Sequence, residues 1–143
     1  MKSNLSLIIF TLLLIMISCS KEETNNMPEN PAEVANTITT GTWKISYFWD
    51  TDHEETQHFN GYSFTFENSG TLVATNGMTN ITGSWSTGTD DSQIKLNIIF
   101  TSPADFEELS DDWHVLERTE NKIRLEDVSG GNGGTDYLTF ERL

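Results

Sequence analysis

One short segment of the sequence gathers many of the residue types that bind metal ions. Carboxylates and imidazoles, which are common metal ligands, follow one another closely in it: Asp50, Asp52, His53, Glu54, Glu55 and His58. Their spacing matches neither a zinc motif nor the loop of an EF-hand. Because the segment falls between two expected strands, where charged side chains are normally solvated, we expect a surface loop, no metal and no cofactor.

The sequence lacks recognisable motifs for catalysis. It contains no Gly-x-Ser-x-Gly element, and the glycine-rich residues 130–134 lie between expected strands, whereas a phosphate-binding loop precedes a helix. Acidic side chains gather at residues 107–112, where we expect a solvated rim. A catalytic carboxylate pair is defined by a distance that a sequence does not contain, so this alternative stays open. We predict that the protein is not an enzyme and has no catalytic residue.

Aromatic residues are the stronger indication of a binding site. They alternate with polar residues on neighbouring expected strands: Tyr47, Trp49, Tyr62, Phe64, Phe66 and Trp85. Strict alternation places Tyr47 and Trp49 on the same face as Trp43. If the strands enclose a hollow, the aromatic side chains would line an apolar or sugar-stacking pocket, with Trp49 and Tyr62 nearest its mouth. The alternative is a close-packed core that holds at least half of them.

The chain from about residue 40 has the alternation that is typical of antiparallel strands with one buried face. We expect eight strands, at residues 42–49, 58–67, 71–75, 81–86, 93–100, 113–119, 122–127 and 137–142. A proline at the first helical position, followed by acidic residues, predicts one short helix at residues 102–109, between the fifth and sixth strands. Eight strands in sequence order indicate an all-β, up-and-down antiparallel barrel, because closure removes exposed strand edges.

The N-terminal residues have the pattern of an exported lipoprotein. Lys2 precedes an apolar run of about 13 residues, which suits the core of a signal peptide and is too short to span a bilayer. The run ends in Met16-Ile17-Ser18-Cys19, which resembles the lipobox of bacterial lipoproteins. This resemblance implies cleavage after residue 18 and acylation of Cys19, whose acyl chains would anchor the protein in a membrane. The alternative is an ordinary secretory signal.

A polar stretch follows Cys19, and it is expected to form a flexible tether over residues 19–36, because Pro28 and Pro31 interrupt regular elements. Within it, residues 20–23 (Ser-Lys-Glu-Glu) are similar to the export signals of Bacteroidetes lipoproteins. This similarity implies an outer-membrane lipoprotein exposed at the cell surface, with a periplasm-facing location as the alternative. The chain thus divides into a signal peptide (residues 1–18), the tether and a folded domain (residues 37–143).

The mature part of the chain is strongly acidic. Lys2 leaves with the signal, so seven of the eight basic residues remain against 22 acidic ones. Nucleic-acid binding needs clustered Lys and Arg to contact phosphates, and this composition argues against it. The same charge argues against a domain that lies on an anionic membrane face, so the expected membrane contact is the lipid on Cys19 alone.

The folded part of the sequence, about residues 38–143, resembles the lipocalin-like (calycin) domain of Bacteroidetes-type outer-membrane lipoproteins. The resemblance is carried, in order, by Gly41-Thr42-Trp43-Lys44-Ile45, which is similar to the Gly-x-Trp opening of lipocalins, Gly70-Thr71-Leu72, Gly83-Ser84-Trp85-Ser86, residues 109–115 and Tyr137-Leu138-Thr139-Phe140. The family implies a barrel with Trp43 as a structural residue at the closed end and a cavity that opens at the other. The chain departs from the family in being shorter and in lacking the long C-terminal helix.

Two functions are compatible with this resemblance. We expect a membrane-tethered, non-enzymatic protein that binds a small apolar or amphipathic ligand inside the barrel. An eight-stranded barrel is just wide enough to hold one small ligand or to be filled by its own side chains. The alternative is therefore a filled-core module that acts in protein interactions as an accessory of a surface assembly.

Overall fold

The structure is a computed structural model that describes residues 26–129 and 133–143. The predicted signal peptide, the predicted acylation site at Cys19 and the predicted export signal lie outside the described residues. Within the described ranges, no helix is long and apolar enough to cross a membrane.

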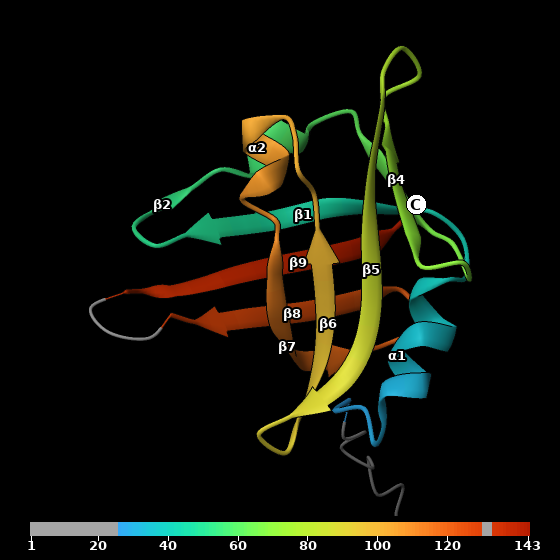
Figure 1. Ribbon diagram of the computed structural model, residues 1–143, viewed down its shortest axis with the longest axis vertical. Coiled ribbons are helices and arrows are strands. Elements are labelled where there is room, and N and C mark those ends of the chain that lie inside the picture. The colour runs from blue at the N-terminus through green and yellow to red at the C-terminus, as the bar shows by residue number, and fades with distance from the viewer. Residues whose placement is uncertain (1–25, 130–132) are drawn as a thin grey trace, which may run out of the picture.

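The described residues form a closed antiparallel barrel (Figure 1). Its strands are β1 (Trp43–Asp50), β3 (Ser63–Phe66), β4 (Thr71–Thr75), β5 (Asn80–Asp90), β6 (Gln93–Ile99), β7 (Asp111–Arg118), β8 (Lys122–Val128) and β9 (Thr135–Arg142). Each strand pairs with the next, and β9 pairs with β1 to close the circle. The two-residue strand β2 (His53–Glu54) pairs with the end of β1. The predicted eight-stranded, up-and-down antiparallel barrel is confirmed.

Three short helices lie at the ends of the barrel: α1 (Pro31–Ile38), the 3₁₀-helix η1 (Thr56–Phe59) and α2 (Ala104–Glu107). Helix α2 confirms the predicted helix between the fifth and sixth barrel strands, although it is shorter than residues 102–109. Two strand boundaries differ from the prediction by more than two residues. The start of the second predicted strand is helical in η1, and β5 continues to Asp90 instead of ending at residue 86.

The predicted flexible tether is wrong for its last residues, because these form α1. The side chain of Asn30 caps this helix by accepting a hydrogen bond from the backbone N–H of Glu33 at 3.2 Å. Pro31 occupies the start of the helix, where its missing N–H removes no hydrogen bond. Val34 and Ile38 are fully buried, so α1 packs on the barrel and belongs to the folded domain.

A bulge in β1 overturns the predicted arrangement of its aromatic residues. The pairing with β9 shifts between Ile45 and Tyr47, and Phe48, not Tyr47, then points into the core. An inserted residue moves every later side chain to the opposite face of the strand. Trp43 and Ile45 therefore face inward, whereas Tyr47 is 38% exposed on the outer wall of the barrel.

Both ends of the barrel are closed by helices. At one end, the indole Nε1 of Trp43 donates a hydrogen bond to the carbonyl of Ile38 in α1 at 2.8 Å, and this burial agrees with the structural role expected for Trp43. At the other end, Phe59 of η1 and Phe106 of α2 meet edge to face, with 5.3 Å between ring centres. Leu109, which follows α2, is also buried there. We call these the α1 end and the α2 end.

Candidate functional site

The structure divides the predicted ligand-binding aromatic residues between the core and the surface. Phe64 and Phe66 lie inside the barrel, at most 1% exposed, and both contact the ring of Phe140 edge to face. Tyr62 packs on Phe106 at the α2 end, with ring centres 5.1 Å apart. Trp85 packs partly buried against Phe66. These four side chains belong to the packing of the barrel and do not line a common pocket.

The remaining two predicted residues, Tyr47 and Trp49, lie on the outer wall. The register of β1 and β9 places Trp49 directly opposite Tyr137, which is 36% exposed. Tyr47, Trp49 and Tyr137 thus share one outer face, and we call them the aromatic wall. Sequence reasoning missed Tyr137 as a member, because only the pairing of the first and last strands brings it beside Trp49.

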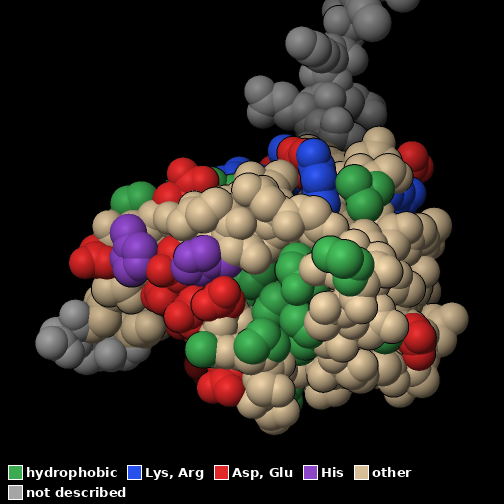
Figure 2. All heavy atoms as spheres, turned by 90° about the horizontal axis from the view of Figure 1, so that it is seen from above, with side chains coloured by type: hydrophobic (Ala, Val, Ile, Leu, Met, Phe, Trp, Pro, Cys, Tyr) green, Lys and Arg blue, Asp and Glu red, His purple; other side chains and the backbone are tan. Residues whose placement is uncertain are grey.

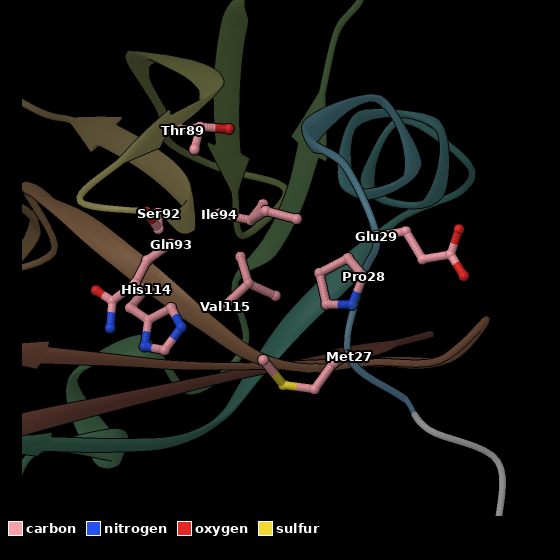
Figure 3. A pocket seen from close by; sticks show the side chains of 9 residues that line it. All are labelled: Met27, Pro28, Glu29, Thr89, Ser92, Gln93, Ile94, His114 and Val115. Atoms are coloured by element: carbon pink, nitrogen blue, oxygen red, sulfur yellow. The ribbon is translucent and has the colours of Figure 1, made fainter.

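Several hollows lie outside the aromatic core, among them two that border strand β6. The pocket in Figure 3 has a volume of about 250 Å³ and lies between the segment before α1 and strands β6 and β7. Its lining includes Met27, Pro28 and Glu29 of that segment, Ile94 of β6, and His114 and Val115 of β7. A wider depression of about 390 Å³ lies on the barrel beside Ile99, Asp111 and Asp112. Sequence reasoning predicted neither of these sites.

Carboxylates gather at the α2 end of the barrel. They come from four strands and from the loops that carry η1 and α2: Asp50, Glu55, Glu108, Asp111, Asp127 and Asp136. In Figure 2, acidic side chains gather beside histidine side chains and border an apolar patch. Removal from water and the neighbouring carboxylate of Glu55 raise the pKa of Glu108 to about 7. Negative charge is therefore concentrated at the α2 end, which we also call the acidic end.

Glu55 corrects the expectation that its segment is simply a solvated loop. The residue is only 9% exposed, because β2 and η1 fold back over the end of the barrel. Its Oε1 atom lies 2.6 Å from Nε2 of His53, and its Oε2 atom lies 3.9 Å from Nδ1 of His58. Hydrogen bonds to Asp52 and then to Glu55 raise the pKa of His53. The segment therefore holds a buried carboxylate between two imidazoles.

Glu108 lies beside the histidine-containing segment, although the sequence alone did not connect the two. It was expected in a solvated rim, with no relation to the histidine segment. In the fold, Glu55, His58 and Glu108 each offer a ligand atom, and these atoms lie within 4.8 Å of one another. Carboxylate and imidazole groups in this arrangement can bind a cation or share a proton. A second group of carboxylates, Asp111, Asp112 and Asp127, is equally close but contains no imidazole.

No protein-family model matches the sequence, and no curated protein is similar to it. Among solved structures, the chain is similar to a DUF4847 family protein from Bacteroides vulgatus, with a TM-score of 0.51 and 18% sequence identity. The match covers 77% of this chain and 97% of that protein. At this level of identity, the likeness concerns the fold alone: this chain has a β-barrel of the kind that occurs in that Bacteroides protein.

Proposed function

We propose that this protein is a lipid-anchored accessory module that binds a partner protein through the outside of its barrel. The observation that carries the proposal is the filled interior. Phe48, Phe64, Phe66 and Phe140 are at most 1% exposed and are tied together by edge-to-face contacts with one another or with neighbouring rings. Ligand pockets usually measure about 300–1,000 Å³. A ligand of that size would have to displace these rings.

The aromatic wall is the surface that supports binding of a protein. Tyr and Trp are enriched in protein interfaces because they bury a large area with few rotatable bonds. The pairing of strands places Glu54 opposite Trp49 and Glu126 opposite Tyr137, so acidic residues flank the wall. Together with the net charge of −14, this favours a partner whose surface carries Lys and Arg around an apolar centre.

The partner test compares two surfaces of one protein. Partners are cross-linked in the cells that make the protein and are recovered with the full chain. The same experiment is done with a double variant, Tyr47→Ser and Tyr137→Ser, and with a control variant, Ile99→Ser. Ile99 is 55% exposed but lies on β6, away from the wall strands β1 and β9. We expect a stoichiometric partner with the wild type and the control, lost with the double variant and weakened by salt. Equal recovery by all three proteins contradicts the role of the wall.

The anchor and its location form a separate part of the proposal. The lipobox-like sequence before Cys19 supports acylation. We expect Cys19→Ser to move the protein from the membrane fraction to the soluble fraction. Protease added to intact cells should degrade a surface-exposed domain, whereas a periplasm-facing domain would survive.

A small amphipathic ligand is a second candidate, supported by the pocket in Figure 3. The apolar side chains of Ile94 and Val115 lie there beside the polar side chain of His114. This lining suits a molecule that has an apolar part and a polar part. Native mass spectrometry of the full chain after incubation with a lipid and glycan extract tests this. An adduct that disappears in Ile94→Trp but persists in the wall variant would support a ligand at this pocket. No adduct would contradict it.

A further inference from the structure

One buried oxygen atom at the acidic end is left without a hydrogen bond. Oε2 of Glu55 is inaccessible to solvent and has no hydrogen-bond partner among the described residues while the neighbouring Glu108 is ionised. Protonated Glu108 can donate a hydrogen bond to the Glu55 carboxylate, so a cation would take the place of that shared proton. The other oxygen of the same carboxylate is engaged with His53 at 2.6 Å. A buried acceptor that is left unsatisfied destabilises the fold, and the penalty is larger when the group is charged. The fold therefore holds an anionic oxygen in a position where an additional group would stabilise it.

Two further side chains point toward this oxygen. Glu55 immediately precedes the 3₁₀-helix η1, and His58 lies inside it, three residues later. Because a 3₁₀-helix has three residues per turn, both side chains lie on the same face. Nδ1 of His58 lies 3.9 Å from Oε2 of Glu55. Glu108, which follows α2, brings a third ligand atom, and all three lie within 4.8 Å of one another.

The scaffold under this cluster is rigid. Phe59 ends η1 and Phe106 lies in α2, and both side chains are 2% exposed. Their rings meet at 5.3 Å, and the ring of Phe106 is held on other sides by Tyr62 at 5.1 Å and by Phe100 at 5.3 Å. The two short helices that carry the cluster are thus fixed to each other by the aromatic core.

We propose that Glu55, His58 and Glu108 bind a divalent transition-metal cation, with Zn²⁺ as the best fit. An imidazole with two carboxylates is a ligand set that suits zinc and its neighbours, whereas Ca²⁺ and Mg²⁺ prefer more oxygen ligands. Three protein ligands leave a coordination position for water or for a group of a bound partner. The cation would meet the unsatisfied oxygen of Glu55 and neutralise the crowded carboxylates.

The distance between Glu55 and His58 is compatible with binding after a small movement. Zinc bonds to nitrogen and oxygen measure about 2.0–2.2 Å, so ligand atoms of a tetrahedral site lie roughly 3.4 Å apart. The separation of 3.9 Å between Glu55 and His58 therefore has to shrink by a few tenths of an ångström. The side chain of His58 is 34% exposed and is free to make this rotation. Asp50 and Asp105 add negative charge around Glu108, which favours the arrival of a cation.

The test is a titration of the full-length chain, purified in detergent and stripped with EDTA, with Zn²⁺, Co²⁺ and Mg²⁺. Calorimetry gives affinity and stoichiometry, and the visible absorption of Co²⁺ reports its coordination geometry, which changes when a ligand is lost. The ligand variants are His58→Gln and Glu108→Gln, which change exposed positions. The controls are His114→Gln, which changes a histidine on β7, and Glu107→Gln, which changes the neighbour of Glu108.

We expect one Zn²⁺ per chain, with affinity reduced at least about tenfold in each ligand variant and unchanged in both controls. The Co²⁺ spectrum should change in His58→Gln and not in His114→Gln. Circular dichroism of each variant checks that its fold is intact. Absence of zinc binding by the wild type, or equal loss of affinity in controls and ligand variants, would overturn the site. Equal affinity for Mg²⁺ and Zn²⁺ would overturn its assignment to a transition metal.

Discussion

The guanidinium group of Arg142 lies over the ring of Trp43, with 4.9 Å between its central carbon and the ring centre. Trp43 begins β1 and Arg142 ends β9, and the two residues are opposite each other where the barrel closes. Nη2 of Arg142 also donates a hydrogen bond to the carbonyl of Thr37 in α1 at 3.3 Å. This pair therefore joins the first strand, the last strand and the helix that closes the α1 end.

Removal of this contact should loosen the α1 end. We expect Arg142→Met to lower the free energy of unfolding by about 1–2 kcal/mol, because it loses a cation–π contact and the bond to Thr37. Arg124→Met is the matched control, since the side chain of Arg124 is 51% exposed on β8. Urea unfolding measures both. A loss as large in Arg124→Met would show that the cationic charge matters rather than the contact.

Two glycines of β5 should respond differently to the same substitution. A Cβ atom at Gly83 would lie close to the carbonyl oxygen of Ile99 and 2.7 Å from the ring of Phe100, whereas one at Gly88 would meet nothing within 4 Å. Because overpacking typically costs 1–3 kcal/mol, we expect Gly83→Ala to destabilise the protein by roughly 2 kcal/mol or more. Gly88→Ala should leave the unfolding midpoint nearly unchanged. Similar midpoints for the two variants would contradict this packing.

Aromatic residues of the core and of the wall should differ in their effect on stability. Phe106→Ala removes the ring that joins α2 to η1, and it should lower the free energy of unfolding by roughly 3–5 kcal/mol. Tyr47→Ala should change it by less than about 0.5 kcal/mol, because that side chain stands on the outer wall. Thermal unfolding of both variants checks this. A strongly destabilised Tyr47→Ala protein would mean that Tyr47 packs into the fold.

The acidic end should make stability depend on pH through Asp136. Burial, followed by the charges of Asp50 and Asp127, raises the pKa of Asp136 above 3.8, although the backbone N–H of Thr51 donates to its carboxylate at 2.6 Å. A raised pKa means that the folded state holds the proton more tightly than the unfolded chain does. The ionised group is therefore unfavourable at neutral pH, and this cost declines as the pH falls through the pKa of the folded state.

It follows that Asp136→Asn should be more stable than the wild type at pH 7, because the amide oxygen still accepts the hydrogen bond from Thr51 without a charge. The gain should shrink toward pH 4, where the wild type becomes protonated. Urea unfolding at both pH values measures the difference. Glu120→Gln removes the same charge from an exposed turn and serves as control. A gain that stays constant between pH 7 and pH 4 would contradict the role of Asp136.

Local alternation was sufficient to predict the strands and their order. Runs such as residues 71–75 and 122–127 alternate apolar and polar side chains over a few residues, and a strand with one buried face needs no more than that. Helix α2 was also predictable from the local sequence, since a proline and early acidic residues mark its start. The lipoprotein signal at Cys19 is read from sequence alone and remains a prediction.

The face of a side chain and its distant neighbours were decided by the tertiary structure. The bulge in β1, set by pairing with β9, turned Tyr47 outward and Phe48 inward, and no local pattern marks it. Asn30 and Pro31 mark the start of helix α1 locally, but the apolar surface of the barrel end on which Val34 packs exists only in the folded barrel. The Glu55 and Glu108 carboxylates met because their loops cross the same barrel end. Alternation sets the period of a strand, but contacts between remote segments depend on closure and register.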